Sequence, residues 1–547
     1  MLIMIFISTT LLMSLSAGDE KTDKVDKLFT KWGSTVSPGA ALAVIKDGKI
    51  IYKRGYGMAN LEHNVSIAPT SVFRIGSTSK QFTASCIAML ALQGKISLDD
   101  DIRKYLPELP KYEKPITIRH LVHHTSGIRD YLTLAEVAAL TDSHFYTPED
   151  TIELLARQKK LNFLPGEEHL YSNSGYFLMG VIVEKASRKS LNDFAQEHIF
   201  KPLGMKNTQF YDDHTRVVNN RAAGYSPTKR GFRIDMTTLD HVGDGGVFTT
   251  VEDLFLWDQA FYNFKLGKEL MKLIQTPGVL NNGEKLDYAF GLEITAYKGL
   301  KRVSHSGGFA GFRAQMVRFP EQRFTVICLA NLGTINPSRL CMEIANIYLA
   351  DKFKEPAKAP EKKVEPIILS KEDLAEKVGN YQDKKTGMWF IISMKEDKLV
   401  IEAQREKFVI SPVSPVNFRA LEAPYDVSID FLPDKNGLTH KAMLILEGEE
   451  IDLLKAPKVR PLTASQLEEY AGEYYNDELP VTYKLVVEKS TLIFKHKNAP
   501  KDALKQMDRD KFTVGEYNIE FRRNKRKKIT GFVLGAGRAV NIEFVKN

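Results

Sequence analysis

Apolar positions near the start of the chain follow the pattern of a β-hairpin. Residues 40–45 are all apolar, and an apolar stretch resumes at residues 50–52. Between them stands Asp47-Gly48, a pair that favours the tight two-residue turn of a hairpin. The sequence therefore predicts two antiparallel strands over residues 40–52.

Farther along, from about residue 77 to residue 266, the apolar spacing becomes that of helices broken by turn-rich loops. Strand patterns then return and one more helix follows them; the predicted ranges are 289–295, 313–319 and 324–329 for the strands and 337–352 for the helix. Because strands stand at both ends of this region and helices lie between them, we expect an α+β domain. The domain should span residues 22–352 and contain an antiparallel sheet assembled from the strands at its two ends.

A segment rich in proline, lysine and glutamate separates this region from the rest of the chain. Residues 353–367 show no apolar periodicity, which is typical of an exposed, semi-rigid linker.

The last part of the chain repeats itself. Gly379-Asn380-Tyr381 returns as Gly472-Glu473-Tyr474 at an offset of 93 residues, and short alternating strand patterns follow each copy. One merged β domain is the alternative to two tandem ones. We favour two small antiparallel β-barrel-like domains; the predicted ranges are 368–456 and 461–547.

The beginning of the chain, residues 1–17, is apolar and ends in small residues, as in a secretory signal peptide. No positive residue precedes the apolar run, so an uncleaved N-terminal anchor is the alternative. With either interpretation we expect a secreted or periplasmic protein.

Composition narrows the class of protein. The chain has 547 residues, 43% of them hydrophobic and 26% charged, which predicts two or three globular domains. The net charge of +8 is modest, and no nucleic-acid motif occurs, so no nucleic-acid partner is expected. The basic run at residues 522–528 is interpreted as a solvated hairpin tip, with contact to a polyanion or the cell envelope as the alternative. The oligomeric state stays open.

Three cysteines, Cys86, Cys328 and Cys341, lie in apolar stretches. An odd number cannot form a complete disulfide framework, so we expect buried thiols, with one disulfide between two of them as the alternative.

The first candidate string for chemistry is Ser77-Thr78-Ser79-Lys80, at the start of a predicted helix. Residues three apart on a helix share a face, so Lys80 lies beside Ser77. A serine hydroxyl needs a base within hydrogen-bond reach to act as a nucleophile, and a buried lysine with a lowered pKa can serve. Backbone N–H groups at the helix start can bind an oxyanion.

The second string, Tyr171-Ser172-Asn173, follows a turn that contains Glu167. A tyrosine phenol near the lysine can relay a proton to a leaving group, and Asn173 can hydrogen-bond both the lysine and a substrate carbonyl. The string is also typical of a helix cap. Glu167 is a candidate deacylating base, but a structural role in the turn is favoured.

The third string is His305-Ser306-Gly307-Gly308, which follows a strand pattern. A strand beside the nucleophile can offer its edge to an extended substrate and one backbone N–H to an oxyanion. Glycine is needed there because a side chain would block the approach.

Together the three strings resemble those of the serine β-lactamase-like family, nearest to class C β-lactamases and D-aminopeptidases. His123-His124-Thr125-Ser126-Gly127-Ile128 and Gly243-Asp244-Gly245-Gly246-Val247 support the resemblance, which covers about residues 25–350. It implies a Ser77 nucleophile with an oxyanion hole made by the N–H groups of Ser77 and Gly308. It also implies two sets of site residues: Ser77, Lys80 and Tyr171 are catalytic, and Asn173, His305, Gly307 and Gly308 bind substrate or the oxyanion.

His305 departs from class C β-lactamases, in which lysine stands there, and agrees with D-aminopeptidases and several esterase-like relatives. A largely neutral histidine holds a substrate carboxylate less firmly than lysine, which argues against efficient penicillin hydrolysis. The two C-terminal β domains also resemble D-aminopeptidase architecture, where such barrels can narrow the cleft.

We therefore expect a secreted or envelope serine hydrolase that acts through an acyl-enzyme on small peptides or amides, D-amino-acid-containing ones included, or on esters. A β-lactamase or D,D-peptidase is the first alternative, and a non-catalytic envelope binding or sensor module is the second. The expected partner is a small-molecule or peptide substrate. No cofactor and no metal are expected, because His120, His123 and His124 lack a nearby acidic or cysteine ligand.

Overall fold

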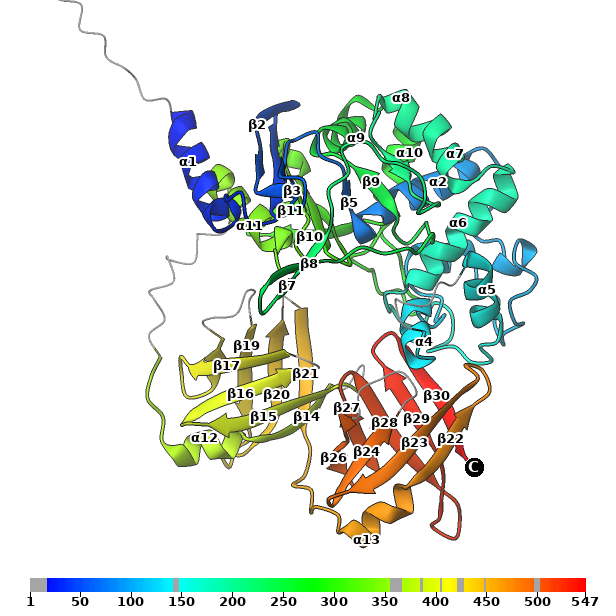
Figure 1. Ribbon diagram of the computed structural model, residues 1–547, viewed down its shortest axis with the longest axis vertical. Coiled ribbons are helices and arrows are strands. Elements are labelled where there is room, and N and C mark those ends of the chain that lie inside the picture. The colour runs from blue at the N-terminus through cyan, green and yellow to red at the C-terminus, as the bar shows by residue number, and fades with distance from the viewer. Residues whose placement is uncertain are drawn as a thin grey trace, which may run out of the picture.

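The computed structural model describes residues 17–140, 147–354, 366–383, 387–403, 406–420, 427–446, 449–495 and 502–547. These residues form an α+β domain and two β domains that lie side by side below it in Figure 1. The predicted signal peptide and most of the predicted linker fall outside the described residues. Among the helices of the described ranges, none is long and apolar enough to cross a membrane.

A six-stranded antiparallel sheet is the centre of the α+β domain, and it joins the two ends of that domain as predicted. Its strand order is β10-β11-β12-β13-β1-β2, so strands from both ends of the domain lie next to each other. Val44 of β1, for example, pairs with Val326 of β13. The strands are β1 (Ala40–Lys46), β2 (Lys49–Tyr56), β10 (Glu293–Tyr297), β11 (Leu300–Phe309), β12 (Phe312–Phe319) and β13 (Phe324–Ala330).

Both faces of β1 are buried, which explains its continuous apolar sequence. Ala41 and Ala43 face one core and Leu42 and Val44 face the other, as strand geometry requires. The β1–β2 hairpin is confirmed, and Asp47 and Gly48 have φ values of 50° and 77°. Positive φ at both turn positions is what the Asp-Gly pair allows at low cost.

Helices cover both faces of the sheet. α1 and α11 pack on one face and α9 packs on the other, with α2 and α6 farther out in the same layer (Figure 1). The helices are α1 (Ala17–Phe29), α2 (Lys80–Leu92), α3 (Ile118–Val122), α4 (Tyr131–Val137), α5 (Pro148–Ala156), α6 (Asn173–Ser187), α7 (Leu191–Ala195), α8 (Lys201–Leu203), α9 (Val251–Asn263), α10 (Lys268–Leu273) and α11 (Pro337–Leu349).

Short strands precede and interrupt the region that is predicted to be helical. They pair as two small sheets and one hairpin, and each is too short to carry an alternating pattern. These are β3 (Met58–Asn60) with β4 (Val65–Ser66), β5 (Phe73–Arg74) and β6 (Gln209–Phe210) on either side of β9 (Val247–Thr249), and β7 (Tyr225–Thr228) with β8 (Gly231–Ile234).

Several predicted elements have different bounds in the structure, and the second strand of the hairpin continues to Tyr56. The strand predicted at 289–295 begins only at Glu293, because Gly291 has a φ of +69° and residues 289–292 form a turn. The last helix ends at Leu349 rather than at residue 352.

The two predicted β domains are confirmed as antiparallel, barrel-like sheets. The first is a closed barrel preceded by a short helix; its elements are α12 (Lys371–Lys377), β14 (Gly379–Asp383), β15 (Trp389–Lys395), β16 (Lys398–Ala403), β17 (Glu406–Pro412), β18 (Asn417–Arg419), β19 (Val427–Pro433), β20 (Thr439–Leu446) and β21 (Glu449–Lys455).

The second is a nine-stranded sheet with order β25-β24-β23-β22-β30-β29-β28-β27-β26, which leaves β25 and β26 as its edges. Its elements are α13 (Ala464–Leu467), β22 (Gly472–Asn476), β23 (Val481–Glu488), β24 (Thr491–Lys495), β25 (Asp502–Ala503), β26 (Lys505–Asp508), β27 (Lys511–Val514), β28 (Tyr517–Arg523), β29 (Ile529–Ala536) and β30 (Ala539–Lys546).

The repeated sequence has a repeated structural role. The Tyr381 hydroxyl donates to the Lys377 carbonyl at 2.8 Å, and the Tyr474 hydroxyl donates to the Tyr470 carbonyl at 2.8 Å. In each domain this contact joins the first strand to the end of the preceding helical turn. The basic run at residues 522–528 forms the exposed tip of the β28–β29 hairpin.

All three cysteines are buried free thiols. Cys86 lies in the core on one face of the sheet, and Cys328 and Cys341 lie in the core on the other. Burial raises the pKa of Cys86 and of Cys341, so neither is a reactive thiolate at neutral pH.

Candidate active site

Ser77 and Lys80 lie where a tight turn leads into α2. Ser77 is in the 3₁₀ turn Gly76–Ser79, and Lys80 is the first residue of the helix. The spacing of three still brings Lys80 Nζ to 3.1 Å from Ser77 Oγ, as predicted. Because α2 runs through the core, the Lys80 side chain is fully buried.

Lys80 Nζ has two further contacts that define its chemistry. It donates to Asn173 Oδ1 at 2.8 Å and to the Asp244 carbonyl at 2.6 Å. A neutral amine has two N–H groups and one lone pair. When both N–H groups are used in these contacts, the lone pair is left for the Ser77 hydroxyl.

Burial lowers the pKa of Lys80 to about 7. The carboxylates of Asp244 and Asp130 act in the opposite direction, and the Arg538 guanidinium adds to the lowering. A substantial fraction of Lys80 is therefore neutral at physiological pH and able to accept a proton.

Tyr171 packs directly against the lysine. The centroid of its ring is 4.8 Å from Lys80 Nζ and 4.2 Å from the centroid of the His124 ring. Its hydroxyl is buried and has no hydrogen-bond partner within the described ranges. Burial raises the pKa of Tyr171, although the nearby Ser77 hydroxyl acts against that rise. Tyr171 is thus protonated at neutral pH and is a proton donor.

Asn173 is held at the N-terminus of α6 by the segment before α4. Its backbone N–H donates to Asp130 Oδ2 at 2.6 Å. The other oxygen of that carboxylate caps α4 by accepting from the Thr133 N–H at 3.1 Å. Asp130 thereby fixes the ends of two helices, and one of them carries a contact to Lys80.

His305 lies on β11 with both ring nitrogens engaged. Nδ1 is 2.6 Å from the Ser306 carbonyl, which requires Nδ1–H as the donor. Nε2 then accepts from the Tyr288 hydroxyl at 3.0 Å. Burial, followed by the charge of Lys80, lowers the pKa of His305 to about 4, so the ring is uncharged at neutral pH.

Glycines let β11 approach the nucleophile closely. A Cβ on Gly307 would lie 1.9 Å from the Ile75 carbonyl and 2.9 Å from the Ser77 nitrogen, and a Cβ on Gly76 would lie 2.6 Å from the Gly308 nitrogen. β10 pairs with β11 only as far as Ser304, so residues 305–309 continue past it beside the 76–79 turn. Thr78 Oγ1 donates to the His305 carbonyl at 3.3 Å, and residues 306–309 of β11 line the cleft.

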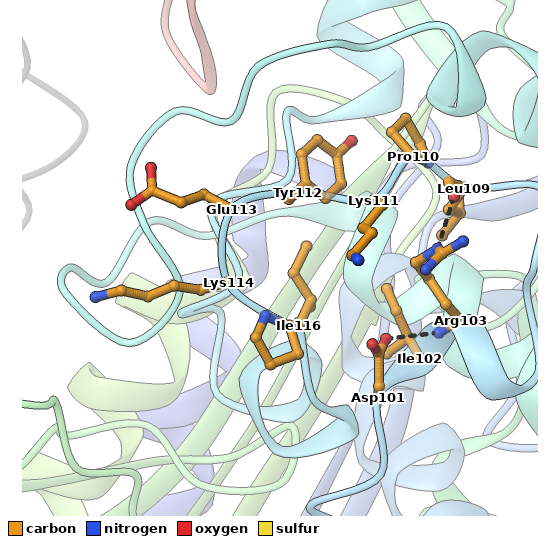
Figure 2. A pocket seen from close by; sticks show the side chains of 11 residues that line it. Asp101, Ile102, Arg103, Leu109, Pro110, Lys111, Tyr112, Glu113, Lys114 and Ile116 are labelled. Atoms are coloured by element: carbon orange, nitrogen blue, oxygen red, sulfur yellow. Dashed lines mark hydrogen bonds between the residues drawn. The ribbon is translucent and has the colours of Figure 1, made fainter.

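These residues surround a cleft of about 500 Å³. Six of the seven predicted site residues line it, and Lys80 lies underneath, in contact with Ser77. Its other charged lining residues are Arg74, Asp244, Glu293 and Arg538. A separate hollow of about 100 Å³ lies under the loop of residues 109–116 and contains none of the predicted site residues (Figure 2).

The remaining candidates from the sequence have structural surroundings. Glu167 is half-exposed, lies 3.9 Å from Lys114 and does not line the cleft, which agrees with a role in the turn. His123 packs edge-on against Phe290, and His124 Nδ1 accepts from the Ser172 N–H at 3.1 Å.

Four residues of the site were missed by reasoning from the sequence. Asp244 stands in the glycine-rich string of residues 243–247, whose sequence does not predict a contact with Lys80. Asp130 and Tyr288 lie in loops and carried no motif. Arg538 belongs to the second β domain, more than two hundred residues from any of the three strings, and nothing local in the sequence points to the cleft.

Comparisons with known proteins agree on one class. Residues 25–346 match the family described as beta-lactamase. A penicillin-binding protein of Bacillus subtilis (strain 168) is 33% identical over 329 residues, which cover 57% of this chain and 72% of that protein. A D-aminopeptidase of Brucella melitensis biotype 1 is 26% identical over 530 residues, which cover 93% of this chain and 95% of that protein. The structure of the octameric penicillin-binding protein homologue from Pyrococcus abyssi aligns with a TM-score of 0.57 at 26% identity, covering 80% of this chain and 100% of that one.

Proposed function

The chain belongs to the β-lactamase family of serine hydrolases, and from that premise we propose that it hydrolyses small peptides, amides or esters through an acyl-enzyme on Ser77. The observation that carries the proposal is the contact of 3.1 Å between Lys80 Nζ and Ser77 Oγ, with both other contacts of Lys80 made to acceptors. A lysine in that arrangement has its lone pair directed at the hydroxyl that it must deprotonate.

In acylation, Lys80 takes the proton of Ser77 as Oγ attacks the substrate carbonyl carbon. The backbone N–H groups of Ser77 and Gly308 stabilise the oxyanion, which the close approach of Gly76 and Gly307 supports. Tyr171 gives its proton to the departing amine or alcohol and regains one from Lys80. Water then attacks the acyl-enzyme ester, and the proton transfers run in the opposite sense.

The substrate class follows from the neutral state of His305. An uncharged imidazole hydrogen-bonded to Tyr288 gives less attraction for a β-lactam carboxylate than a lysine would. This favours D-amino-acid-containing amides and peptides over penicillins, and the D-aminopeptidase relative that spans nearly the whole chain supports the same choice. A β-lactamase or D,D-peptidase is the alternative, and stable labelling by a fluorescent penicillin would favour it.

We also propose export from the cytoplasm, because residues 1–17 have the pattern of a secretory signal peptide.

The deciding experiment is release of p-nitroaniline from D-Ala-p-nitroanilide by the purified protein, with the L-isomer and the Ser77→Ala variant in parallel. We expect turnover of the D-isomer that the variant lacks, while circular dichroism shows the same fold for both proteins. Full activity in Ser77→Ala would refute the nucleophile. Turnover of the L-isomer alone would refute the proposed stereochemistry.

A further inference from the structure

A charged side chain from the second β domain reaches the cleft. Arg538, in the turn between β29 and β30, lines the cleft beside Ser77 and Tyr171. Its guanidinium carbon lies 4.7 Å from the centroid of the Tyr171 ring. The cation therefore enters the cleft from outside the α+β domain.

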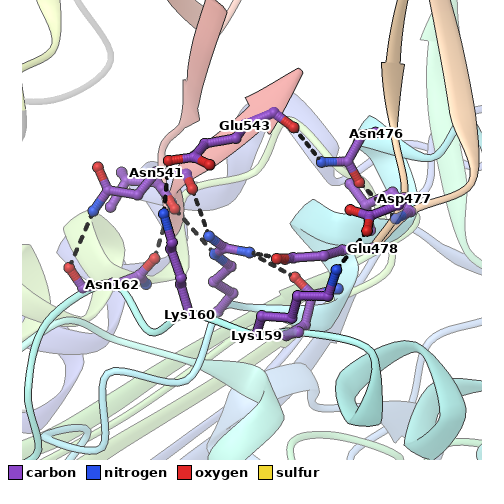
Figure 3. A network of polar contacts seen from close by, with 12 residues as sticks. Lys159, Lys160, Asn162, Asn476, Asp477, Glu478, Asn541 and Glu543 are labelled. Carbon is purple, nitrogen blue, oxygen red and sulfur yellow. Dashed lines mark hydrogen bonds and ion pairs between the residues drawn. The ribbon is translucent and has the colours of Figure 1, made fainter. Parts of the chain in front are cut away.

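The hairpin that carries Arg538 is fixed by its backbone. The Arg538 carbonyl accepts from the Asp130 N–H at 3.2 Å and from Asn162 Nδ2 at 3.0 Å. The Val540 N–H donates to Asn162 Oδ1 at 2.9 Å. Figure 3 shows the polar network in which Asn162 and Asn541 take part. The backbone of Arg538 is thus held in place by contacts that do not involve its guanidinium.

The guanidinium of Arg538 forms no hydrogen bond or ion pair with any residue that the structure describes. Its charge nevertheless acts on the site, because it lowers the pKa of Lys80 and opposes the rise in the pKa of Tyr171. Close to another cation, an arginine without an acidic partner is unfavourable for the protein alone. It becomes favourable when an anion occupies the cleft.

The location of Arg538 identifies which part of a substrate it meets. Tyr171 delivers its proton to the leaving group, so a group stacked on the Tyr171 ring lies beside the leaving group. His305 is uncharged and cannot supply a cation there. The other arginine that lines the cleft, Arg74, lies over the Phe309 ring, 5.1 Å from its centroid. A planar guanidinium suits a carboxylate, which it can bind through two parallel N–H···O bonds.

We propose that Arg538 binds a carboxylate on the leaving group of the substrate. The preferred substrates are then short peptides whose leaving group is an amino acid with a free carboxylate, in preference to the corresponding amides. This inference rests on the proposed function and names the substrate class of the same site.

The test compares two substrates that differ only in this charge, D-Ala-Gly and D-Ala-glycinamide. We expect the wild-type protein to have the higher kcat/KM for the carboxylate, and Arg538→Ala to lower the ratio of the two values by about tenfold or more. Arg538→Lys should give an intermediate ratio, because a lysine keeps the charge but not the paired geometry. Arg526→Ala removes the same charge from the exposed β28–β29 tip and should leave the ratio unchanged. An equal ratio in wild type and Arg538→Ala would overturn the inference.

A binding experiment separates this inference from the proposed function. The Ser77→Ala protein is titrated with each peptide by calorimetry, with and without Arg538→Ala. Tighter binding of D-Ala-Gly that is lost with Arg538 supports the carboxylate site even if neither peptide is hydrolysed. Equal or absent binding of the two peptides refutes it even if Ser77-dependent turnover of D-Ala-p-nitroanilide is found.

Discussion

Lys80 is the residue whose environment bears most directly on activity. Burial lowers its pKa to about 7, and its N–H groups are occupied by Asn173 and Asp244. The string Ser77-Thr78-Ser79-Lys80 predicts its contact with Ser77, because residues three apart at the start of a helix share a face. The lowered pKa depends on burial and on charges from other parts of the chain, so local sequence could only suggest it.

The first prediction concerns pH. Because Lys80 must be neutral to accept a proton, kcat/KM should rise with pH and level off above the pKa of about 7. Removing the positive charge in Arg538→Ala raises the pKa of Lys80, so the acidic limb should move to higher pH. Arg526→Ala should leave the limb in place. An acidic limb at the same pH in wild type and Arg538→Ala would contradict this account of the lysine.

The second prediction concerns the close approach of β11. Gly307→Ala places a Cβ 1.9 Å from the Ile75 carbonyl, and backbone must move to relieve that contact. We expect a loss of about 1–3 kcal/mol in the free energy of unfolding. Gly308→Ala meets only the flexible Arg313 side chain at 3.2 Å and should destabilise less. Equal denaturation midpoints for the two variants would show that the approach is not tight.

At the scale of elements, the site is formed where the N-termini of α2 and α6 meet the part of β11 that extends beyond β10. The sequence predicted helical starts at the first two strings and a strand before the third. It did not predict that the loop before α4 holds the N-terminus of α6, because the contact between Asp130 and Asn173 is made between residues far apart in the chain.

The third prediction tests this link. Asp130→Ala removes the cap of α4 and the acceptor for the Asn173 N–H, so stability should fall by about 1 kcal/mol or more, and kcat should fall with it. The control is Ser190→Ala, which removes the cap of α7, a helix that does not line the cleft. In the wild type the Ser190 hydroxyl accepts from the Asp193 N–H at 3.0 Å. That control should lose stability with little change in kcat. Unchanged kcat in Asp130→Ala would show that Asp130 has no positioning role.

At the scale of the whole molecule, the main feature is the packing of the second β domain against the α+β domain. Buried apolar residues of that domain are continuous with the core of the α+β domain, whereas the closed barrel has a core of its own. Arg129 lies within the docking interface, where it donates to the Val540 carbonyl at 3.0 Å and to the Asn541 carbonyl at 2.6 Å. Its ion pair with Glu478 is buried, with side-chain exposures of 1% and 11%.

The fourth prediction compares this buried pair with an exposed one in the same interface. Arg129→Ala removes the hydrogen-bond donor to Glu478, to Gln158 and to two backbone carbonyls, so stability should fall by about 3–5 kcal/mol. Lys160→Ala breaks an exposed pair with Glu543 and should change the melting temperature little. Limited proteolysis should then cut Arg129→Ala faster. Similar melting temperatures for the two variants would mean that the buried pair does not hold the domains together.

The sequence by itself determined the parts of this protein that depend on spacing along the chain. The hairpin at residues 40–52 follows from apolar runs around Asp47-Gly48, and the pair Ser77 and Lys80 follows from helical periodicity. The two β domains follow from the repeat, since each copy must bury its own alternating strands.

Only the tertiary structure decided how the site is enclosed and charged. Asp244 and Arg538 line the cleft, whereas Asp130 and Tyr288 contact Asn173 and His305, which line it. These contacts join distant segments and leave no periodic signal in the sequence. Burial, which sets the protonation states of Lys80 and His305, is likewise a property of the folded molecule. It depends on how completely neighbouring segments exclude water from each side chain.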